Sequence, residues 1–349
     1  MSEHTFEPKV FAGLDEAGYG PLLGPLTYGF AAFRCARGEG PSWARLEAAT
    51  SAQRVAAPKA ALRTKGAQGA VERPPALARL VVADSKEVFD RTPRGMQRLE
   101  STALAFLAQR PAGGVRDGRA LVTCAPPGLA PSDAELAAHP WYTALPATLP
   151  AHVAPRVLDE HGARLAAALD SAALELVDAG ARVVPVGPLN RAFEAAGNKG
   201  TAHFALGGAL LVSLFERFGA EGLDFTCDRL GGRMRYGAHL AGLVPFSDVR
   251  ALREDPEWSE YELTRGPARM RVRFVEKGDR RWFTVALASC LAKYARELVM
   301  DAFNAHFGAL DPGLAPTAGY VQDGRRWLAE SAAARARAGV AEQDLVRIR

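Results

Sequence analysis

One stretch of the sequence decides the predicted fold: Val10-Phe11-Ala12-Gly13-Leu14-Asp15-Glu16-Ala17-Gly18-Tyr19-Gly20-Pro21-Leu22-Leu23-Gly24-Pro25-Leu26. Its apolar start runs directly into glycines and prolines, which favours a short buried strand over a helix. Asp15 and Glu16 therefore lie at the end of this strand, where the glycines let the chain bend. Acids at the mouth of a buried strand are costly unless a cation meets them, so the segment indicates a divalent metal site. The alternative is a pair of solvated loop acids.

The composition indicates a soluble globular protein with a large core. The chain has 349 residues, 48% of them hydrophobic, and a formal net charge of +4. Such a chain can form one large α/β domain or two smaller ones. The mild positive charge permits a polyanionic partner without requiring one.

The cysteines and the apolar segments exclude several classes of protein. The four cysteines form no Cys-x-x-Cys pair, so neither a zinc site nor a disulfide framework is indicated, and a reducing compartment fits. The amino terminus does not resemble a secretory signal. The longest apolar run, about residues 204–215, is shorter than the roughly 20 residues that a membrane span needs. We expect a cytoplasmic protein with no membrane association.

The order of the predicted elements indicates an α/β fold. After a second strand at residues 26–35, the patterns predict helices and strands in this order: a helix at 94–109, a strand at 121–124, a helix at 157–178, a strand at about 182–186, a helix at about 201–218, a strand at 223–227, a hairpin of 258–263 with 270–275, and a helix at 282–303. Opening strands that form a hairpin, followed by strands that alternate with helices, predict a mixed sheet covered on both faces.

Four acids each lie at the end of a predicted strand or just before a helix: Asp15, Glu16, Asp228 and Asp279. Sites in α/β sheets form beyond the carboxyl ends of the strands, so these side chains can converge. Converging carboxylates raise one another's pKa unless cations keep them ionised. Two Mg²⁺ or Mn²⁺ ions about 4 Å apart do this and also support phosphodiester hydrolysis. The sequence has no His-Glu-x-x-His, nucleophile elbow or P-loop, so other hydrolytic chemistries have little support.

Several motifs together resemble those of the type 2 ribonucleases H, the ribonuclease HII family, which cut the RNA strand of RNA–DNA duplexes. The opening motif is Asp15-Glu16-Ala17-Gly18-x-Gly20-Pro21-Leu22-x-Gly24-Pro25. The further matches, in the order of that family, are Asp84-Ser85-Lys86, the strand-ending Asp228, Lys277-Gly278-Asp279, Ala288-Ser289-x-Leu291-Ala292-Lys293-x-x-Arg296, and Gly319-Tyr320, where the family has a tyrosine that stacks beside the ribonucleotide.

The resemblance implies a fold and a domain organisation. The fold would be a ribonuclease H-like, mixed five-stranded sheet, with antiparallel opening strands followed by parallel strands and with helices on both faces. The catalytic domain would span residues 1–310, with unmatched insertions at about 36–79 and 111–185. Residues 311–349 would form a helical extension that contacts the substrate. We expect a monomer.

The resemblance also implies a site. Asp15, Glu16, Asp228 and Asp279 would be both the catalytic residues and the ligands of two Mg²⁺ or Mn²⁺ ions. An RNA–DNA hybrid or ribonucleotide-containing DNA would contact Gly18, Tyr19, Gly20, Lys86 and Tyr320, with the main chain of the two glycines near the 2′-hydroxyl that distinguishes RNA from DNA.

Tyr19 is the main departure from the family, because it stands where the family's Gly-Arg-Gly has its arginine. A tyrosine ring cannot make the forked, charged contact that a guanidinium makes to a phosphate. The departure leaves open whether a single embedded ribonucleotide is cut as well as a continuous hybrid.

Two other functions remain open at this stage. One is a catalytically silent hybrid-binding protein on the same scaffold. The other is an actin-like or sugar-kinase-like ATPase, whose second phosphate loop could correspond to Asp228-Arg229-Leu230-Gly231-Gly232. Metal-dependent cleavage, ATP turnover, or binding without either would distinguish the three.

Overall fold

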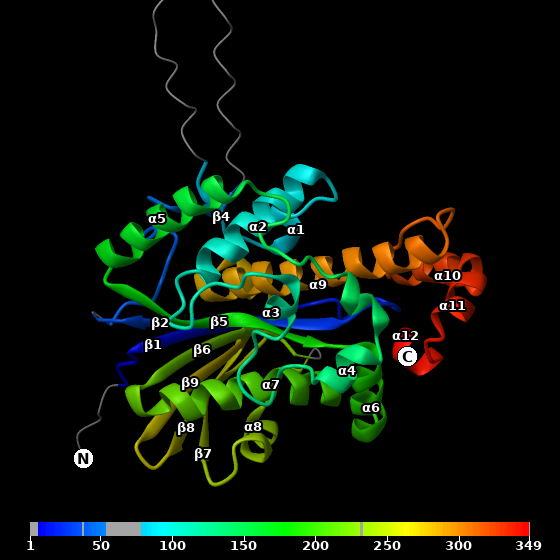
Figure 1. The fold of residues 1–349 in the computed structure, drawn as a ribbon. Helices are drawn as coiled ribbons and strands as arrows, with labels where there is room; N and C mark the ends of the chain where they lie inside the picture. Colours follow the sequence, from blue (N-terminus) through cyan, green and yellow to red (C-terminus); the bar gives the residue numbers. More distant parts are fainter. Residues whose placement is uncertain (1–5, 37, 54–77, 231–232, 349) are drawn as a thin grey trace, which may run out of the picture.

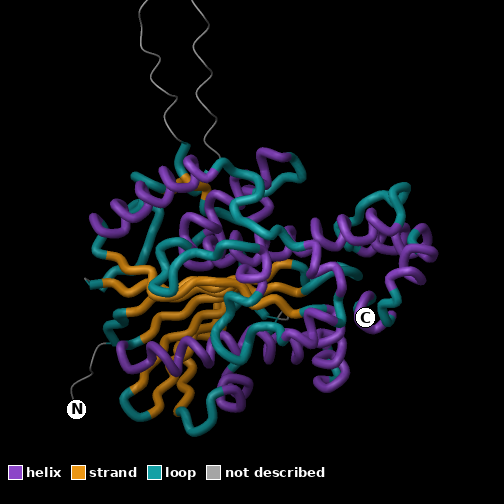
Figure 2. The backbone as a smooth tube through the Cα atoms, in the orientation of Figure 1, coloured by secondary structure: helices purple, strands orange, loops and turns teal. Residues whose placement is uncertain are grey.

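A seven-stranded mixed sheet forms the centre of the computed structural model, which describes residues 6–36, 38–53, 78–230 and 233–348. Figures 1 and 2 show this sheet between two layers of helices. The strands, in their order across the sheet, are β5 (Leu174–Val184), β2 (Leu26–Cys35), β1 (Val10–Ala17), β6 (Leu223–Asp228), β9 (Ala268–Val275), β8 (Trp258–Arg265) and β7 (Asp248–Glu254). A separate pair consists of β3 (Thr50–Ser51) and β4 (Leu80–Val81).

The directions of the strands agree with the prediction. β1 pairs antiparallel with β2, and β2 with β5, whereas β1, β6 and β9 run parallel. The predicted α/β class, with a mixed sheet covered on both faces, is confirmed. The sheet has seven strands rather than five, because β8 and β7 extend it antiparallel beyond β9. The hairpin predicted from residues 258–275 is confirmed as β8 and β9.

The helices form two layers (Figure 1). The layer above the sheet contains α1 (Ser85–Val88), α2 (Pro93–Leu107), α3 (Gly118–Val122), α5 (Pro155–Ser171) and the long α9 (Phe283–Leu310). The layer below it contains α6 (Val186–Ala196), α7 (Lys199–Phe218) and α8 (Gly237–Leu243). The remaining elements are α4 (Asp133–Ala137), η1 (Pro140–Ala144), η2 (Gly219–Glu221), η3 (Gly278–Arg280), α10 (Val321–Glu330), α11 (Ala332–Ala338) and α12 (Glu342–Leu345).

Alternation along the strands gives each helical layer its own core. Leu14 of β1 packs on the α7 side, whereas Phe33 of β2 packs on the α9 side. On the α9 side, a Cβ on Gly13 would overlap the main chain of Thr284, and one on Gly29 would overlap the main-chain oxygen of Ala288. These two glycines therefore let α9 lie directly against β1 and β2, which brings the residues of this helix to the end of β1.

Two elements differ from the prediction. The helix predicted at 157–178 ends at Ser171, and β5 then runs over Leu174–Val184 instead of about 182–186. Residues 174–178 suit either structure locally, and pairing with β2 decides for the strand. The strand predicted at 121–124 is instead the end of the short helix α3, which Asp117 caps by accepting from the N–H of Ala120.

The two predicted insertions differ in how they relate to the sheet. Much of the first, residues 54–77, lies outside the described residues. The second, at about 111–185, includes β5 and so supplies an edge strand of the main sheet.

The segment after α9 folds back onto the core. α11 contacts α9, α12 contacts α6, and Val346 pairs with Leu23 in an isolated antiparallel bridge. Residues 311–348 thus return to the glycine-rich loop that follows β1.

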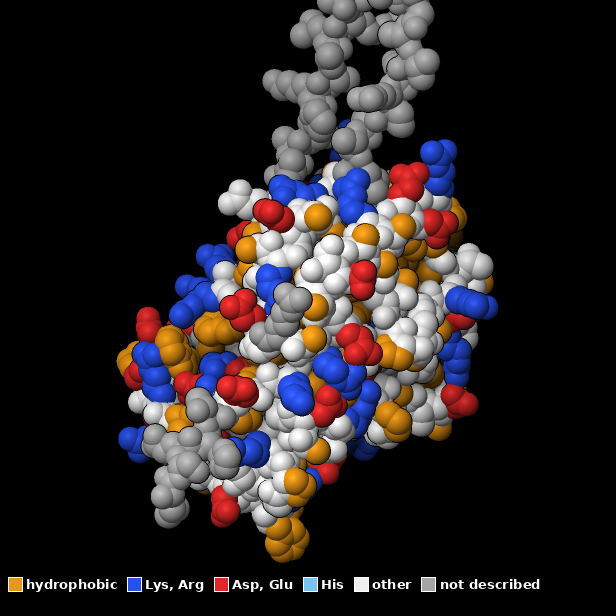
Figure 3. Space-filling model, turned by 90° about the vertical axis from the view of Figure 1, so that its left-hand side faces the viewer, with side chains coloured by type: hydrophobic (Ala, Val, Ile, Leu, Met, Phe, Trp, Pro, Cys, Tyr) orange, Lys and Arg blue, Asp and Glu red, His pale blue; other side chains and the backbone are white. Residues whose placement is uncertain are grey.

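The face of the molecule at which β1 begins carries Lys and Arg side chains interspersed with Asp and Glu (Figure 3). Charges of both signs indicate an ordinary solvated surface there rather than a strongly cationic one. Within the described ranges, no helix combines the length and the apolar character that crossing a bilayer requires.

Candidate active site

The register of two parallel strands places Asp15 beside Asp228. Leu14 of β1 lies opposite Cys227 of β6, so the next residue along each strand is one of the two acids. Neighbouring residues at matching positions of parallel strands point to the same face of a sheet. Both carboxylates therefore lie at the carboxyl edge of the sheet, on the side that α9 covers.

Asp15 is held by its surroundings. Its residue is only 8% exposed, the N–H of Glu16 donates to its Oδ1 over 2.8 Å, and the hydroxyl of Ser289 on α9 also bonds to it. Burial raises the pKa of Asp15 well above its ordinary value, and the charges of Glu16, Asp228 and Asp279 raise it further. The electrostatic influence of all three shows that the four predicted acids lie near one another.

A tight turn connects Asp228 to Asp279. Lys277 has the left-handed backbone conformation, with φ of 55°, and the N–H of Gly278 donates to Oδ1 of Asp228 over 3.4 Å. Burial raises the pKa of Asp228. Burial also raises the pKa of Asp279 to about 6, and the charges of Asp84 and Asp228 add to this increase. The turn thus brings the last predicted acid back to the end of β6.

Glu16 points away from Asp15, as alternation along a strand requires, and faces α7. Its Oε2 lies 3.9 Å from Nε2 of His203. Burial lowers the pKa of His203 to about 4, so the imidazole is neutral and gives the carboxylate no counter-charge. Burial and the charge of Asp228 raise the pKa of Glu16 to about 7, and its Oε2 is buried with no hydrogen-bond partner.

Lys86 lies within electrostatic reach of the acids. It is exposed on the short helix α1, where Asp84 caps the helix by accepting from the N–H of Lys86 over 3.0 Å. Its charge lowers the pKa of both Glu16 and Asp279. An exposed ammonium beside the acids suits contact with a phosphate.

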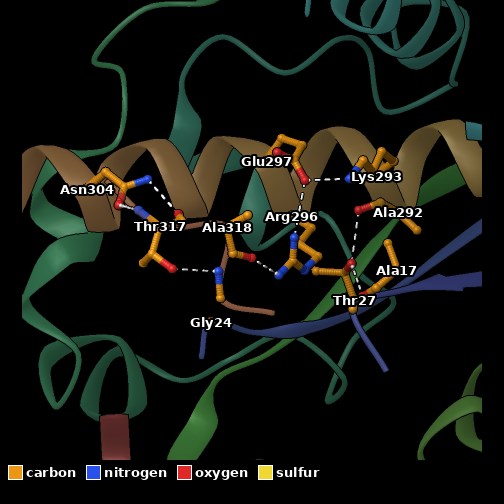
Figure 4. Close-up of polar contacts among 12 residues, drawn as sticks. Ala17, Gly24, Thr27, Ala292, Lys293, Arg296, Glu297, Asn304, Thr317 and Ala318 are labelled. Atoms are coloured by element: carbon orange, nitrogen blue, oxygen red, sulfur yellow. Dashed lines mark hydrogen bonds and ion pairs between the residues drawn. The ribbon is translucent and has the colours of Figure 1, made fainter. Parts of the chain in front are cut away.

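Gly18 occupies a position that only glycine fits. Its φ is +90°, and a Cβ there would overlap Nε of Arg296 and lie 2.9 Å from the main-chain oxygen of Pro25. Arg296, on α9, is 1% exposed and donates to the main-chain oxygen of Ala318 over 3.0 Å and to Glu297 over 3.2 Å. Figure 4 shows this arginine between α9 and the segment around Ala318.

Thr27 fastens α9 to the strands beside this loop. Its hydroxyl lies 3.0 Å from the main-chain oxygen of Ala17 and 2.9 Å from that of Ala292 (Figure 4). The end of β1 and the middle of α9 are thereby joined at the point where the glycine loop begins.

The two aromatic residues predicted to contact substrate are both exposed. Tyr19 is 38% exposed, and its ring centroid lies 4.4 Å from that of His203. Tyr320 is 47% exposed, and its ring lies 5.6 Å from the guanidinium carbon of Arg296. The main-chain oxygen of Gly319 accepts from the N–H groups of Leu22 and Leu23, so Tyr320 is held beside the glycine loop. Gly20 is exposed and faces open space.

The donor chemistry at these acids fits a hard divalent cation. Carboxylate oxygens are the ligands that Mg²⁺ and Mn²⁺ prefer, and the buried Oε2 of Glu16 has no hydrogen-bond partner among the described residues. Within the same part of the chain, no three His, Cys, Asp or Glu side chains are already gathered into a metal-ligating group.

Two residues at this site carried no signal in the sequence. His203 is one histidine in a largely apolar helix, a pattern more typical of a core position, and nothing in the local sequence links it to Glu16. Arg347 is 4% exposed and donates to main-chain oxygens of the glycine loop, with 323 residues separating it from Gly24. Only the tertiary structure brings these side chains to the site.

No protein-family model matches this sequence, and no curated protein matches it. Solved structures are similar over most of the chain. For a structure of the PCNA–RNase HII complex from Archaeoglobus fulgidus, the TM-score is 0.41 at 14% identity, over 97% of this chain and 94% of that one. For the ribonuclease H2 of Pyrococcus horikoshii OT3 the values are 0.41 and 14%, over 96% and 92%. For a mutant of Bst-RNase HIII they are 0.41 and 15%, over 98% and 67%. Similarity at this level does not establish a shared function.

Proposed function

We propose that this chain is a metal-dependent endonuclease that cleaves the RNA strand of RNA–DNA hybrids. The observation that carries the proposal is the placement of Asp15 and Asp228 at matching ends of two adjacent parallel strands. Glu16 and Asp279 lie close enough to add to the electrostatic repulsion there. Natural proteins rarely keep four mutually repelling, half-buried acids together unless the acids bind cations.

The four acids would hold two Mg²⁺ or Mn²⁺ ions. When bound, such ions activate a water molecule and stabilise the leaving oxygen of a phosphodiester. Asp15 is kept in place by Ser289 and by the N–H of Glu16, and Asp228 by the N–H of Gly278. The protein thus contributes a fixed, partly desolvated set of carboxylates.

The surfaces around the acids suit a nucleic acid. Lys86 would contact a phosphate, and the exposed rings of Tyr19 and Tyr320 would stack against sugar or base. The main chain at Gly18 and Gly20 would lie near the 2′-hydroxyl, which is the group that distinguishes RNA from DNA. The mixed sheet topology, with β1, β6 and β9 parallel, supports the same assignment because it places the strand ends at one edge.

Cleavage of an end-labelled RNA–DNA hybrid by the purified protein tests this proposal. We expect RNA-strand nicks with Mg²⁺ or Mn²⁺ and none with EDTA. Asp15→Asn and Asp279→Asn should each lower the rate at least about 100-fold, because each substitution removes a carboxylate that would ligate metal. RNA duplex, DNA duplex and ATP serve as the substrates for the competing activities.

Asp248→Asn is the matched control, since Asp248 is an exposed aspartate at the start of the edge strand β7. It should cleave at the wild-type rate. Full cleavage by both site variants would reject the assignment of these acids. Binding of the hybrid without cleavage in any divalent metal would favour the catalytically silent alternative.

A further inference from the structure

We propose that Arg347 is a positioning residue that holds the loop between Gly18 and Gly24 in the shape that receives the hybrid. The inference rests on the proposed function for the identity of the ligand. The geometry of the loop itself is independent of that function and can be tested without it.

One guanidinium joins the two ends of the loop. Nε and Nη2 of Arg347 donate to the main-chain oxygen of Gly24 over 2.8 and 2.6 Å. Nη1 donates to the main-chain oxygen of Gly18. Both loop ends are thus fixed by a side chain that is itself buried.

The segment that carries Arg347 is anchored on both sides. Its own N–H donates to the main-chain oxygen of Leu22 over 3.0 Å. Asn190, on α6, donates to the main-chain oxygen of Val346 over 2.8 Å and accepts from the N–H of Ile348 over 2.9 Å. The arginine is therefore delivered to the loop by a segment that is fastened to the body of the protein.

The bond to Gly18 sets the direction of a main-chain donor. In a trans peptide the C=O and the following N–H point to opposite sides. Because the oxygen of Gly18 points to Arg347 in the interior, the N–H of Tyr19 points away from it. Arg347 in this way orients the main chain that we assign to contact with the nucleic acid.

Stability alone does not explain a guanidinium at this position. Among the described residues no carboxylate is paired with Arg347, and the neighbouring Arg296 adds a second buried positive charge. A buried charge without a counter-charge is costly, and an aliphatic side chain would fill the space without that cost. A guanidinium, by contrast, offers several N–H donors in a fixed planar arrangement. The structure uses three of these nitrogens on two loop oxygens.

Hydrogen exchange and steady-state kinetics on the full chain test the proposal. Arg347→Met keeps much of the side-chain volume and removes the donors, and Arg347→Lys keeps the charge. The matched control is Arg337→Met, at an exposed position of α11. Asn190→Ala loosens the anchoring segment without changing Arg347, and so provides a milder variant if Arg347→Met does not fold.

In Arg347→Met we expect amide exchange in residues 17–25 to increase at least about tenfold, with exchange in β5 unchanged. KM for the hybrid should rise at least about tenfold, with kcat within about threefold, because the loop binds substrate and holds no metal ligand. Arg347→Lys should restore part of both, Asn190→Ala should move both in the same direction by less, and Arg337→Met should match the wild type.

Wild-type exchange in residues 17–25 of Arg347→Met would overturn the proposal. Faster exchange with an unchanged KM, or a loss confined to kcat, would overturn the substrate-positioning role. If the wild-type protein cleaves no hybrid, the proposed function fails, and the exchange measurement alone then decides whether Arg347 holds the loop.

Discussion

Nε2 of His203 lies 3.9 Å from Oε2 of Glu16, and the two side chains reach each other from α7 and β1. Burial keeps this imidazole neutral, because it lowers the pKa of His203 to about 4. The Glu16 carboxylate lies near three other acids, and the cation that lowers its pKa is the exposed Lys86. In the metal-free protein this leaves Glu16 poorly stabilised in its charged form.

The stability of the metal-free protein should depend on pH through Glu16. Its pKa in the folded protein is raised from 4.5 to about 7, so between these values the folded state binds more protons than the unfolded state. Stability contributed by this group is thus present at low pH and is lost as pH rises through that window. Glu16→Gln removes the effect, so in EDTA its Tm should gain on that of the wild type between about pH 5 and pH 8. Parallel Tm curves for the two proteins would contradict this prediction.

Gly18→Ala should destabilise the protein, because φ is +90° and the new Cβ would overlap Nε of Arg296. We expect a loss of about 1–3 kcal/mol in the free energy of unfolding. Gly20→Ala is the control, since its Cβ would meet nothing within 4 Å, and should stay within about 0.5 kcal/mol of the wild type. Urea denaturation of both variants measures the difference. Equal stabilities would show that the loop does not need glycine at position 18.

Gly29→Ala tests the close approach of α9 to the sheet. A Cβ on Gly29 would overlap the main-chain oxygen of Ala288, and backbone cannot move aside as a flexible side chain can. We expect a loss of at least about 2 kcal/mol, and lower metal affinity, because α9 carries the Ser289 that bonds to Asp15. Gly308→Ala, in the same helix with open space around it, should instead be neutral or stabilise by up to about 1 kcal/mol. A tolerated Gly29→Ala would mean that helix and sheet are not held this closely.

Tyr19 should set the preference between substrates. Its ring lies against His203 and has no charged group to offer a phosphate. We expect the wild type to cut a continuous hybrid faster than a DNA duplex with one ribonucleotide, and Tyr19→Arg to narrow that ratio. Tyr19→Phe, which keeps the ring, should leave the ratio unchanged. Equal wild-type rates on the two substrates would show that the family's arginine is dispensable here.

Features that depend on local sequence could be predicted. The acids at the end of β1 and the glycine turn after them follow from a short apolar run that ends abruptly, and the β8–β9 hairpin follows from two alternating runs around Gly266. The class of the fold follows from the order of these elements.

Features that depend on tertiary contacts could not be predicted. The start of β5 is decided by pairing with β2, and β7 is a highly charged edge strand whose composition resembles a loop. His203 and Arg347 reach the site only through the folded chain, because each is far in sequence from the group that it approaches.

The most direct test of the central claim is Mn²⁺ binding to the purified protein, measured by calorimetry and by the loss of the free-ion electron paramagnetic resonance signal. Wild type and the Asp248→Asn control should bind Mn²⁺ alike, and Asp15→Asn and Asp279→Asn should each bind at least about tenfold more weakly, because each lacks a carboxylate of the shared site. Equal Mn²⁺ affinity in all four proteins would contradict a metal centre built from Asp15, Glu16, Asp228 and Asp279.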